Sequence, residues 1–359
     1  MVDCSVTPRS LLLLGLLAGA CHPPAPASTS PVPVVAPAPT AAPETPQPIA
    51  VVDGHVFETP VALIGEDEWA RGCFIGRDVV AVVSVGDEHR WSTWAPPYDR
   101  ASDHGPMPNR ASHVACAGTR AIVIANDTTF MVAPGVEPDR SEGSVRVERV
   151  DHDGNRKVVF DETVERVDPW TPSPLLLHDL AVAPDGSAYA YAVSRGHVSE
   201  NPTRAVVRDA DSDEVVGETE GTVLGWDGEG LVVLRADGSL SRWSEEWQPT
   251  SKRGAVPPAL WAMHVDDATM VLSGGAARTR YTTSAMSPRP SLGERVIPVG
   301  AHELIWGDWL VRADRGAAKR LFEGDRRFAV VDAQPDLVLA HEVVVDEERR
   351  YEGLFVARR

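Results

Sequence analysis

Residues 178–191 read His178-Asp179-Leu180-Ala181-Val182-Ala183-Pro184-Asp185-Gly186-Ser187-Ala188-Tyr189-Ala190-Tyr191, two apolar runs around a short polar turn. Short apolar runs bounded by Pro, Asp and Gly are typical of β-strands. The glycine of an Asp-Gly pair supplies the positive φ that a tight hairpin requires. The stretch therefore predicts two consecutive strands joined by a hairpin.

The same pattern continues through residues 51–359. Further turn pairs separate strand-like runs: Asp153-Gly154, Asp227-Gly228 and Asp237-Gly238. No stretch has the periodicity of a long amphipathic helix. The chain is therefore predicted to be all-β.

Apolar runs recur along the chain, beginning at Val79, Ala121, Ala188, Leu231, Met270, Leu310 and Leu337. Their spacings are 42, 67, 43, 39, 40 and 27 residues, and four of these are close to one four-stranded propeller blade. The longest interval predicts an insertion within residues 137–168. The shortest predicts that an N-terminal strand near Val51–Phe57 completes the last blade and covers its edge.

The stretch at 178–191 resembles the repeat of TolB-like and WD40-like propellers, in which an inner strand runs through a Pro-Asp-Gly turn into the next strand. Partial matches to this repeat occur at residues 225–231 and 265–270. The resemblance implies a β-propeller of about seven blades, within a range of six to eight. It implies no activity, because propellers host enzymes, scaffolds and receptors alike.

Residues 1–20 are predicted to be a signal peptide, with a polar start and an apolar run, Leu11–Leu17, that is too short to span a bilayer. Ala18-Gly19-Ala20-Cys21 resembles the lipoprotein box of bacterial signals, which implies lipidation of Cys21. His22 differs from the aspartate associated with inner-membrane retention, so the likeness favours the outer membrane. There are two alternatives. In one, the same bond is the site of ordinary secretory cleavage without lipidation. In the other, the protein is cytosolic and residues 1–20 are only a hydrophobic N-terminal segment.

Residues 21–50 are predicted to be a lipid-anchored linker, and residues 51–359 the propeller domain. Ten prolines and seven alanines occupy residues 22–50. Proline fixes φ and removes the amide donor, so this segment should form an extended tether. A proline-rich ligand for some partner is the alternative.

The composition excludes several classes of protein. Of 359 residues, 43% are hydrophobic and 24% charged, as in soluble proteins with a sizeable core rather than multi-span membrane proteins. Acidic residues outnumber basic ones 52 to 34, for a net charge of -18. Such a chain repels phosphate backbones, so no nucleic acid partner is expected.

Cys73 and Cys116 lie 43 residues apart and precede their apolar runs by similar distances, which places them on like strands of neighbouring blades. A disulfide is possible there in an oxidising compartment, and two separate buried thiols are the alternative. His113 lies near Cys116, but no further pair completes four metal ligands. No metal site is expected.

Two other groups suggest chemistry. Asp151, Asp153 and Asn155, with Glu162, imitate the oxygen ligands of a calcium loop, but the flanking segments favour a hairpin turn. His178 and Asp179 are adjacent, and on a regular strand their side chains would point to opposite faces and not meet. His178 remains a candidate for the central channel, and no catalytic residue is assigned.

Tryptophan is abundant, with ten residues, and several lie at or near expected blade starts: Trp226, Trp261, Trp306 and Trp309. Trp91 and Trp94 are expected on one strand or turn. Packing between blades accounts for such rings, and a surface that stacks sugars or grips a peptide is the alternative.

The leading hypothesis is a non-enzymatic exported lipoprotein that binds a protein or polysaccharide at the cell envelope. We expect a monomer that needs no cofactor and touches the membrane only through its lipid, facing the periplasm or the cell surface. A secreted or soluble periplasmic protein is the alternative location. The alternative functions are an exported hydrolase or lyase with a site in the channel, and a calcium- or redox-responsive module.

Overall fold

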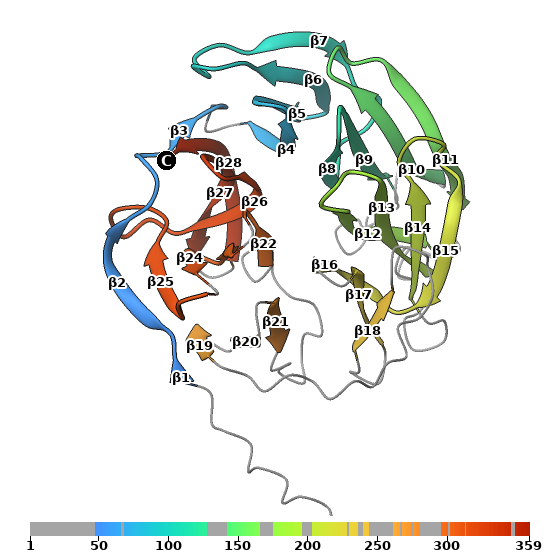
Figure 1. Cartoon of the computed structure of the whole chain (residues 1–359). Coiled ribbons are helices and arrows are strands. Elements are labelled where there is room, and N and C mark those ends of the chain that lie inside the picture. Colours follow the sequence, from blue (N-terminus) through green and yellow to red (C-terminus); the bar gives the residue numbers. More distant parts are fainter. Residues whose placement is uncertain are drawn as a thin grey trace, which may run out of the picture. The chain divides into compact units, whose positions relative to one another are not determined.

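The computed structural model (Figure 1) contains strands and no helix among the residues that it describes. It describes residues 47–65, 68–127, 142–165, 175–195, 203–227, 230–235, 240–243, 261–265, 268–273, 276–280, 296–300, 302–312, 314–345 and 349–359. All of them belong to one unit of the chain, Pro43–Arg359. The predicted signal peptide and most of the predicted linker, including Cys21, lie outside the described residues.

The first three sheets each contain four strands that are consecutive in the chain. Sheet 1 consists of β4 (Trp69–Ile75), β5 (Asp78–Val85), β6 (Glu88–Trp94) and β7 (Ser102–Pro106). Sheet 2 consists of β8 (His113–Ala117), β9 (Arg120–Asp127), β10 (Glu142–Asp151) and β11 (Arg156–Glu165). Sheet 3 consists of β12 (Leu175–Val182), β13 (Ala188–Arg195), β14 (Arg204–Asp209) and β15 (Val215–Glu220).

Four further sheets follow. Sheet 4 consists of β16 (Thr222–Asp227), β17 (Gly230–Leu234) and β18 (Leu240–Trp243). Sheet 5 contains β19 (Trp261–Val265), β20 (Ala268–Ser273) and β21 (Ala276–Arg280). Sheet 6 contains β22 (Val296–Pro298), β23 (Glu303–Trp306), β24 (Trp309–Arg312) and β25 (Ala317–Arg320). Sheet 7 contains β26 (Phe328–Gln334), β27 (Leu337–Val345) and β28 (Arg349–Arg358).

Contacts link most of the neighbouring sheets into a ring. Strand β4 contacts β8, β8 contacts β12, and β12 contacts β16. Farther along, β16 contacts β21 and β22 contacts β26, while β26 and β28 return to β4 of sheet 1. The chain is therefore an all-β propeller, as the sequence predicts, and Figure 1 shows the sheets following one another around the ring.

The repeat seen in the sequence corresponds to the sheets. Each of the seven apolar runs lies in a different sheet, in β5, β9, β13, β17, β20, β24 and β27. The expected insertion within residues 137–168 is wrong for the described part of that stretch, 142–165. Those residues form β10 and β11, the two strands that complete sheet 2.

The N-terminal segment pairs with three consecutive sheets. β1 (Gln47–Pro48) pairs in parallel with β19, and β2 (Ala50–His55) pairs in parallel with β25. β3 (Val61–Ala62) pairs antiparallel with β28 and so completes sheet 7. The expectation that Val51–Phe57 completes the last blade is therefore wrong. Residues 50–55 pair with sheet 6, Phe57 packs in a cluster with side chains of sheet 7, and the strand that completes sheet 7 is β3. Strand pairing also starts at Gln47, ahead of the predicted boundary at Val51.

The hydrophobic core lies between neighbouring sheets. Alternate side chains of each strand point to the two faces of its sheet, so each sheet packs against both neighbours. The cluster between sheets 2 and 3, for example, contains Ile122, Val145, Leu175 and Tyr189. The large side chains of this fold therefore hold the ring together.

The Pro-Asp-Gly turn is a hairpin, as predicted, and Gly186 has a φ of +74°. A Cβ atom at Gly186 would lie 2.8 Å from the backbone nitrogen of Gly118 in sheet 2. The turn thus needs glycine both for its backbone conformation and for its close approach to the neighbouring turn. Gly154 also has a positive φ. Gly228 and the pair Asp237-Gly238 lie outside the described residues.

Candidate functional site

A cavity of about 300 Å³ lies where one strand from each of six sheets meets the middle of the ring. The strands that line it are β4, β8, β12, β16, β22 and β26. Each of these is a terminal strand of its sheet. One edge of each strand therefore carries backbone N–H and C=O groups that the sheet ladder does not use. The cavity offers backbone hydrogen-bonding groups alongside apolar side chains.

Asp332 is the carboxylate that lines this cavity. It lies at a register shift in β26, and its two oxygens accept hydrogen bonds from the backbone amides of Phe74 (2.7 Å) and Ala333 (2.8 Å). Burial raises the pKa of Asp332 to about 6, although the two amide donors favour the charged form. Its oxygens therefore hold the last sheet to the first.

Cys73 and Cys116 form a disulfide on the wall of the cavity. Their Cα atoms are 5.6 Å apart, within the range that a disulfide spans. Cys73 lies in β4 and Cys116 in β8, which are like strands of neighbouring sheets. The bridge therefore joins sheet 1 to sheet 2.

Most tryptophans whose side chains are described serve packing. Trp91 and Trp94 share β6 and are buried, as is Trp306. Trp309 packs beneath the guanidinium of Arg320, 5.7 Å from the ring centre. Trp226 also packs against the core between sheets 3 and 4, and in addition it lines the cavity. The described lining of the cavity thus contains the aromatic ring of Trp226 as well as Asp332 and the strand edges.

His178, a candidate for the central channel, is not among the described residues that line the cavity. Its side chain instead forms a hydrogen-bonded chain within sheet 3. In this arrangement Nδ1–H donates to the carboxylate of Asp179, and Nε2 accepts from the hydroxyl of Ser194 at 2.8 Å. The Ser194 hydroxyl also lies 3.0 Å from that of Thr203. His178 and Ser194 are both buried.

The expectation that His178 and Asp179 cannot meet is wrong. Strand β12 has a register shift between His178 and Ala181, and Asp179 has a φ of +57°. A β-bulge breaks the alternation of side chains and turns both residues toward each other. Nothing in the sequence marks Asp179 as a residue with positive φ.

The calcium-like motif is a hairpin turn, as expected. The carboxylate of Asp151 accepts hydrogen bonds from the backbone and side-chain amides of Asn155. Glu162 lies in β11 and forms two hydrogen bonds with Arg195, at 2.9 and 2.8 Å. Within the described ranges, no group of three or more His, Cys, Asp or Glu side chains could hold a metal ion.

Sequence reasoning missed several buried titratable groups, including two, a carboxyl group and an imidazole, with strongly shifted pKa values. Asp332 is one, and its only signal is a carboxylate that interrupts an apolar strand. His341 is the other, and its Nε2 lies 3.0 Å from a guanidinium nitrogen of Arg71. Burial, together with the charge of Arg71, lowers the pKa of His341 to about 4, so its ring is neutral at pH 7.

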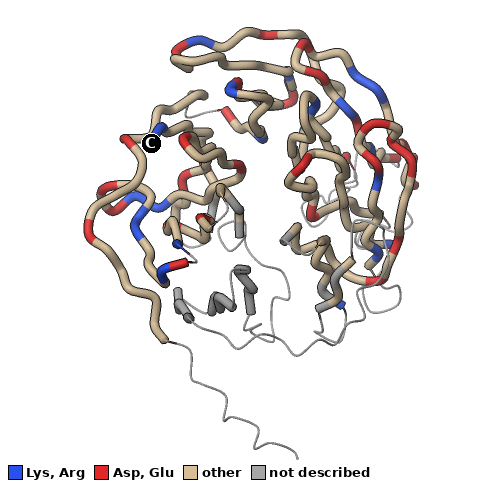
Figure 2. Tube along the Cα trace, in the orientation of Figure 1, with Lys and Arg blue, Asp and Glu red and all other residues tan. Residues whose placement is uncertain are grey.

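Charge is dispersed over the described part of the chain. Figure 2 shows acidic residues on turns and strands of several sheets, interspersed with basic ones. No helix among the described residues is long and apolar enough to cross a membrane.

No protein-family model and no curated protein matches the chain. Among solved structures, the chain is similar to an oligogalacturonate lyase from Vibrio parahaemolyticus, with 10% identity over 83% of this chain and 92% of that one and a TM-score of 0.46. It is also similar to an acylaminoacyl peptidase from Pyrococcus horikoshii, with 9% identity, a TM-score of 0.44 and coverage of 79% of this chain. The chain spans only 52% of that peptidase.

TolB from Acinetobacter baumannii is a third similar structure, with 9% identity over 76% of this chain and 60% of that one and a TM-score of 0.34. At such identities these likenesses concern the fold alone.

Proposed function

We propose that this protein is a non-enzymatic exported lipoprotein whose propeller binds a protein or a polysaccharide at the cell envelope. Residues 1–20 would direct export, Cys21 would carry the lipid, and the proline-rich segment that follows would hold the propeller away from the membrane. The proposed location is the outer membrane, facing the periplasm or the cell surface.

The observation that carries the binding role is the cavity at the middle of the ring. Six strand edges present backbone donors and acceptors there, and peptides and glycans both hydrogen-bond to such groups. Trp226 adds an aromatic face on the same wall. Aromatic rings stack on sugars and pack against peptide side chains, so this wall suits either class of partner.

The disulfide supports export. Disulfides persist in oxidising compartments and are rare in the cytosol of most organisms. The bridge between Cys73 and Cys116 joins two sheets across 43 residues of chain, as is common in exported domains.

Site-specific photo-crosslinking in intact cells tests the binding role. Benzoylphenylalanine replaces Trp226 in one variant and Trp309, outside the cavity, in a matched variant. The proposal predicts a covalent adduct of defined mass, protein or glycan, from position 226 and none from position 309. Bare monomer from both positions, or equal adducts from both, would contradict it.

The anchor has a separate test. Mass spectrometry of the protein purified from membranes should find a lipid-modified N-terminal cysteine at Cys21, and C21A should release the protein in soluble form. An unmodified Cys21 on a soluble protein would indicate secretory cleavage without an anchor and leave the binding role unaffected.

A second candidate function is hydrolysis, favoured by the chain of hydrogen bonds in sheet 3. Asp179 orients the ring of His178, whose Nε2 is placed to take the proton from the Ser194 hydroxyl. That order of groups is the one serine hydrolases use to activate a nucleophile. Both Ser194 and His178 are buried, so a substrate would have to displace covering residues.

A fluorophosphonate probe distinguishes this candidate from the first. A hydrolase would be labelled at Ser194 and S194A would not react, whereas S187A, whose hydroxyl bonds to Asp185 instead, would react as the unchanged protein does. Failure of the folded protein to react would dismiss hydrolysis through Ser194 and leave binding as the function.

A further inference from the structure

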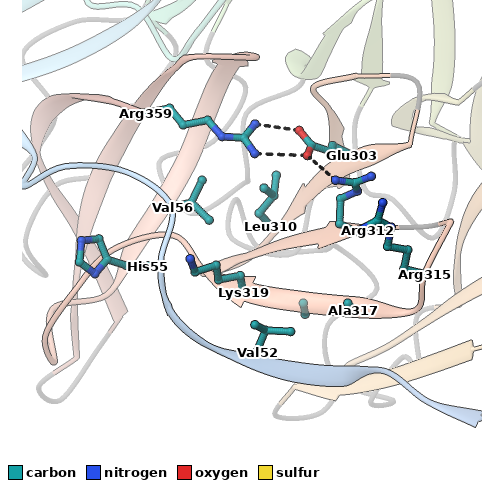
Figure 3. A pocket seen from close by; sticks show the side chains of 11 residues that line it. Val52, His55, Val56, Glu303, Leu310, Arg312, Arg315, Ala317, Lys319 and Arg359 are labelled. Atoms are coloured by element: carbon teal, nitrogen blue, oxygen red, sulfur yellow. Dashed lines mark hydrogen bonds and ion pairs between the residues drawn. The ribbon is translucent and has the colours of Figure 1, made fainter.

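A second cavity lies away from the middle of the ring, between β2 and the strands β23, β24 and β25 of sheet 6 (Figure 3). Its volume is about 330 Å³, at the lower end of the range for small-molecule sites. Val52, Val56 and Leu310 form much of its apolar wall. The pocket exists because β2 adds a fifth strand to the sheet, pairing with β25 in parallel.

Basic side chains dominate the polar part of this pocket, in a chain whose net charge is -18. Among the described residues, four cationic side chains line it, Arg312, Arg315, Lys319 and Arg359, together with the carboxylate of Glu303. This local excess of positive charge opposes the charge of the whole chain and attracts anions.

The arginines are engaged with carboxylates. Arg359 pairs with Glu303 at 2.8 Å, and Arg312 lies 3.4 Å from the same carboxylate, as Figure 3 shows. The hydrogen bonds from Arg359 hold the pKa of Glu303 below its usual value, so this carboxylate stays charged. Arg315 pairs with Asp314 at 3.5 Å.

Lys319 differs from the arginines. Within the part of the chain that the structure describes, its ammonium has no ion pair and no hydrogen bond. It lies opposite Val52 in the strand register and is half-buried. Figure 3 shows the ammonium on the side of the pocket bordered by Val56 and His55. A Cβ atom at Gly54 would lie 3.2 Å from Cε of Lys319, so the side chain packs against the β2 backbone.

We propose that this pocket binds an organic monoanion with an apolar body, a carboxylate whose hydrocarbon part packs on Val52, Val56 and Leu310. Its carboxylate would accept hydrogen bonds from the Lys319 ammonium, which has three donors. Inorganic phosphate fits less well, because a dianion needs more free hydrogen-bond donors than one ammonium offers. The apolar wall would also remove water molecules from the phosphate without supplying other hydrogen-bond donors.

Calorimetric titration of the full chain with octanoate, 1-octanol and inorganic phosphate tests this proposal. We expect octanoate to bind at least about tenfold more tightly than 1-octanol or phosphate. In K319Q the affinity for octanoate should fall at least about tenfold, since a hydrogen bond between charged groups is lost. R320Q is the matched control, because Arg320 is the next residue of β25, does not line the pocket, and bonds instead to the carbonyl of Gly324.

A317L is a second variant, which fills the pocket without removing a charge, and it should also weaken octanoate binding. Four results would each overturn the proposal: no binding of octanoate, equal binding of octanoate and 1-octanol, phosphate binding as tightly as octanoate, or unchanged octanoate affinity in a folded K319Q or A317L. None of these results bears on the partner proposed for the central cavity.

Discussion

The carboxylate of Asp332 accepts a hydrogen bond of 2.7 Å from the backbone amide of Phe74, across 258 residues of sequence. This bond joins β26 of the last sheet to β4 of the first, at the junction where the ring closes. It also places a carboxylate that lines the central cavity on that junction. Closure of the fold and the chemistry of the cavity therefore depend on the same side chain.

The ionisation of Asp332 should make stability depend on pH. Its pKa is raised from 3.8 to about 6 by burial, so the folded state holds the proton more tightly than the unfolded state. Its contribution to stability is full below pH 4 and is lost as pH rises through 6, by up to about 3 kcal/mol. Urea unfolding at pH 4 and pH 7 should show that the advantage of the unchanged protein over D332N shrinks at pH 7. A constant or growing advantage would contradict this.

His341 should produce the opposite slope. Burial lowers its pKa from 6.5 to about 4, so folding favours the neutral ring. Its contribution is present above pH 6.5 and is lost as pH falls through 4. The unchanged protein should therefore lose its advantage over H341Q between pH 7 and pH 4, by up to about 3 kcal/mol. Unfolding curves that run parallel across this range would show that the ring is not buried as described.

Removal of the disulfide should destabilise the propeller without unfolding it. The bridge closes a loop of 43 residues, which corresponds to roughly 2–4 kcal/mol. In thermal melting, C73A/C116A should unfold at a lower temperature than the unchanged protein. Reductant should lower the melting temperature of the unchanged protein and have no effect on the double variant. A reductant effect of equal size on both would contradict the bridge.

Two glycines separate the effects of backbone conformation and close packing. Both Gly186 and Gly118 have a positive φ, but a Cβ at Gly118 would have no heavy atom within 4 Å. G118A should cost about 1 kcal/mol from backbone strain alone, and G186A about 1–3 kcal/mol more, because its Cβ would meet the Gly118 backbone. Equal losses in chemical denaturation would mean that the two turns do not pack against each other.

Local patterns predicted much of the fold. The seven apolar runs indicated seven repeats because each is a strand of a different sheet. The turn at Gly186 and the hairpin at Gly154 could be predicted from the sequence, because the positive φ at these positions favours glycine. The N-terminal pairing was predicted only in part: a strand from this segment does complete the last sheet, but β1 and β3 contain two residues each and carry no alternation that would locate them.

The candidate sites were harder to predict from the sequence than the fold was. The central cavity is assembled from six strands that are far apart in the sequence, and its carboxylate shows only as a polar residue in an apolar strand. The alternation of side chains along a regular strand gave the wrong orientation for His178 and Asp179, because the bulge at Asp179 overrides it. The pocket at Lys319 depends on β2 pairing with β25, and that pairing was not anticipated.

The most direct test of binding in the central cavity is the affinity of the purified protein for the partner recovered by crosslinking. Trp226 lines the cavity and Trp309 does not, so W226A and W309A remove the same side chain inside and outside the site. We predict that W226A weakens binding at least about tenfold while W309A leaves it unchanged, with both variants folded by circular dichroism. Equal affinity of W226A and the unchanged protein would contradict binding in the cavity.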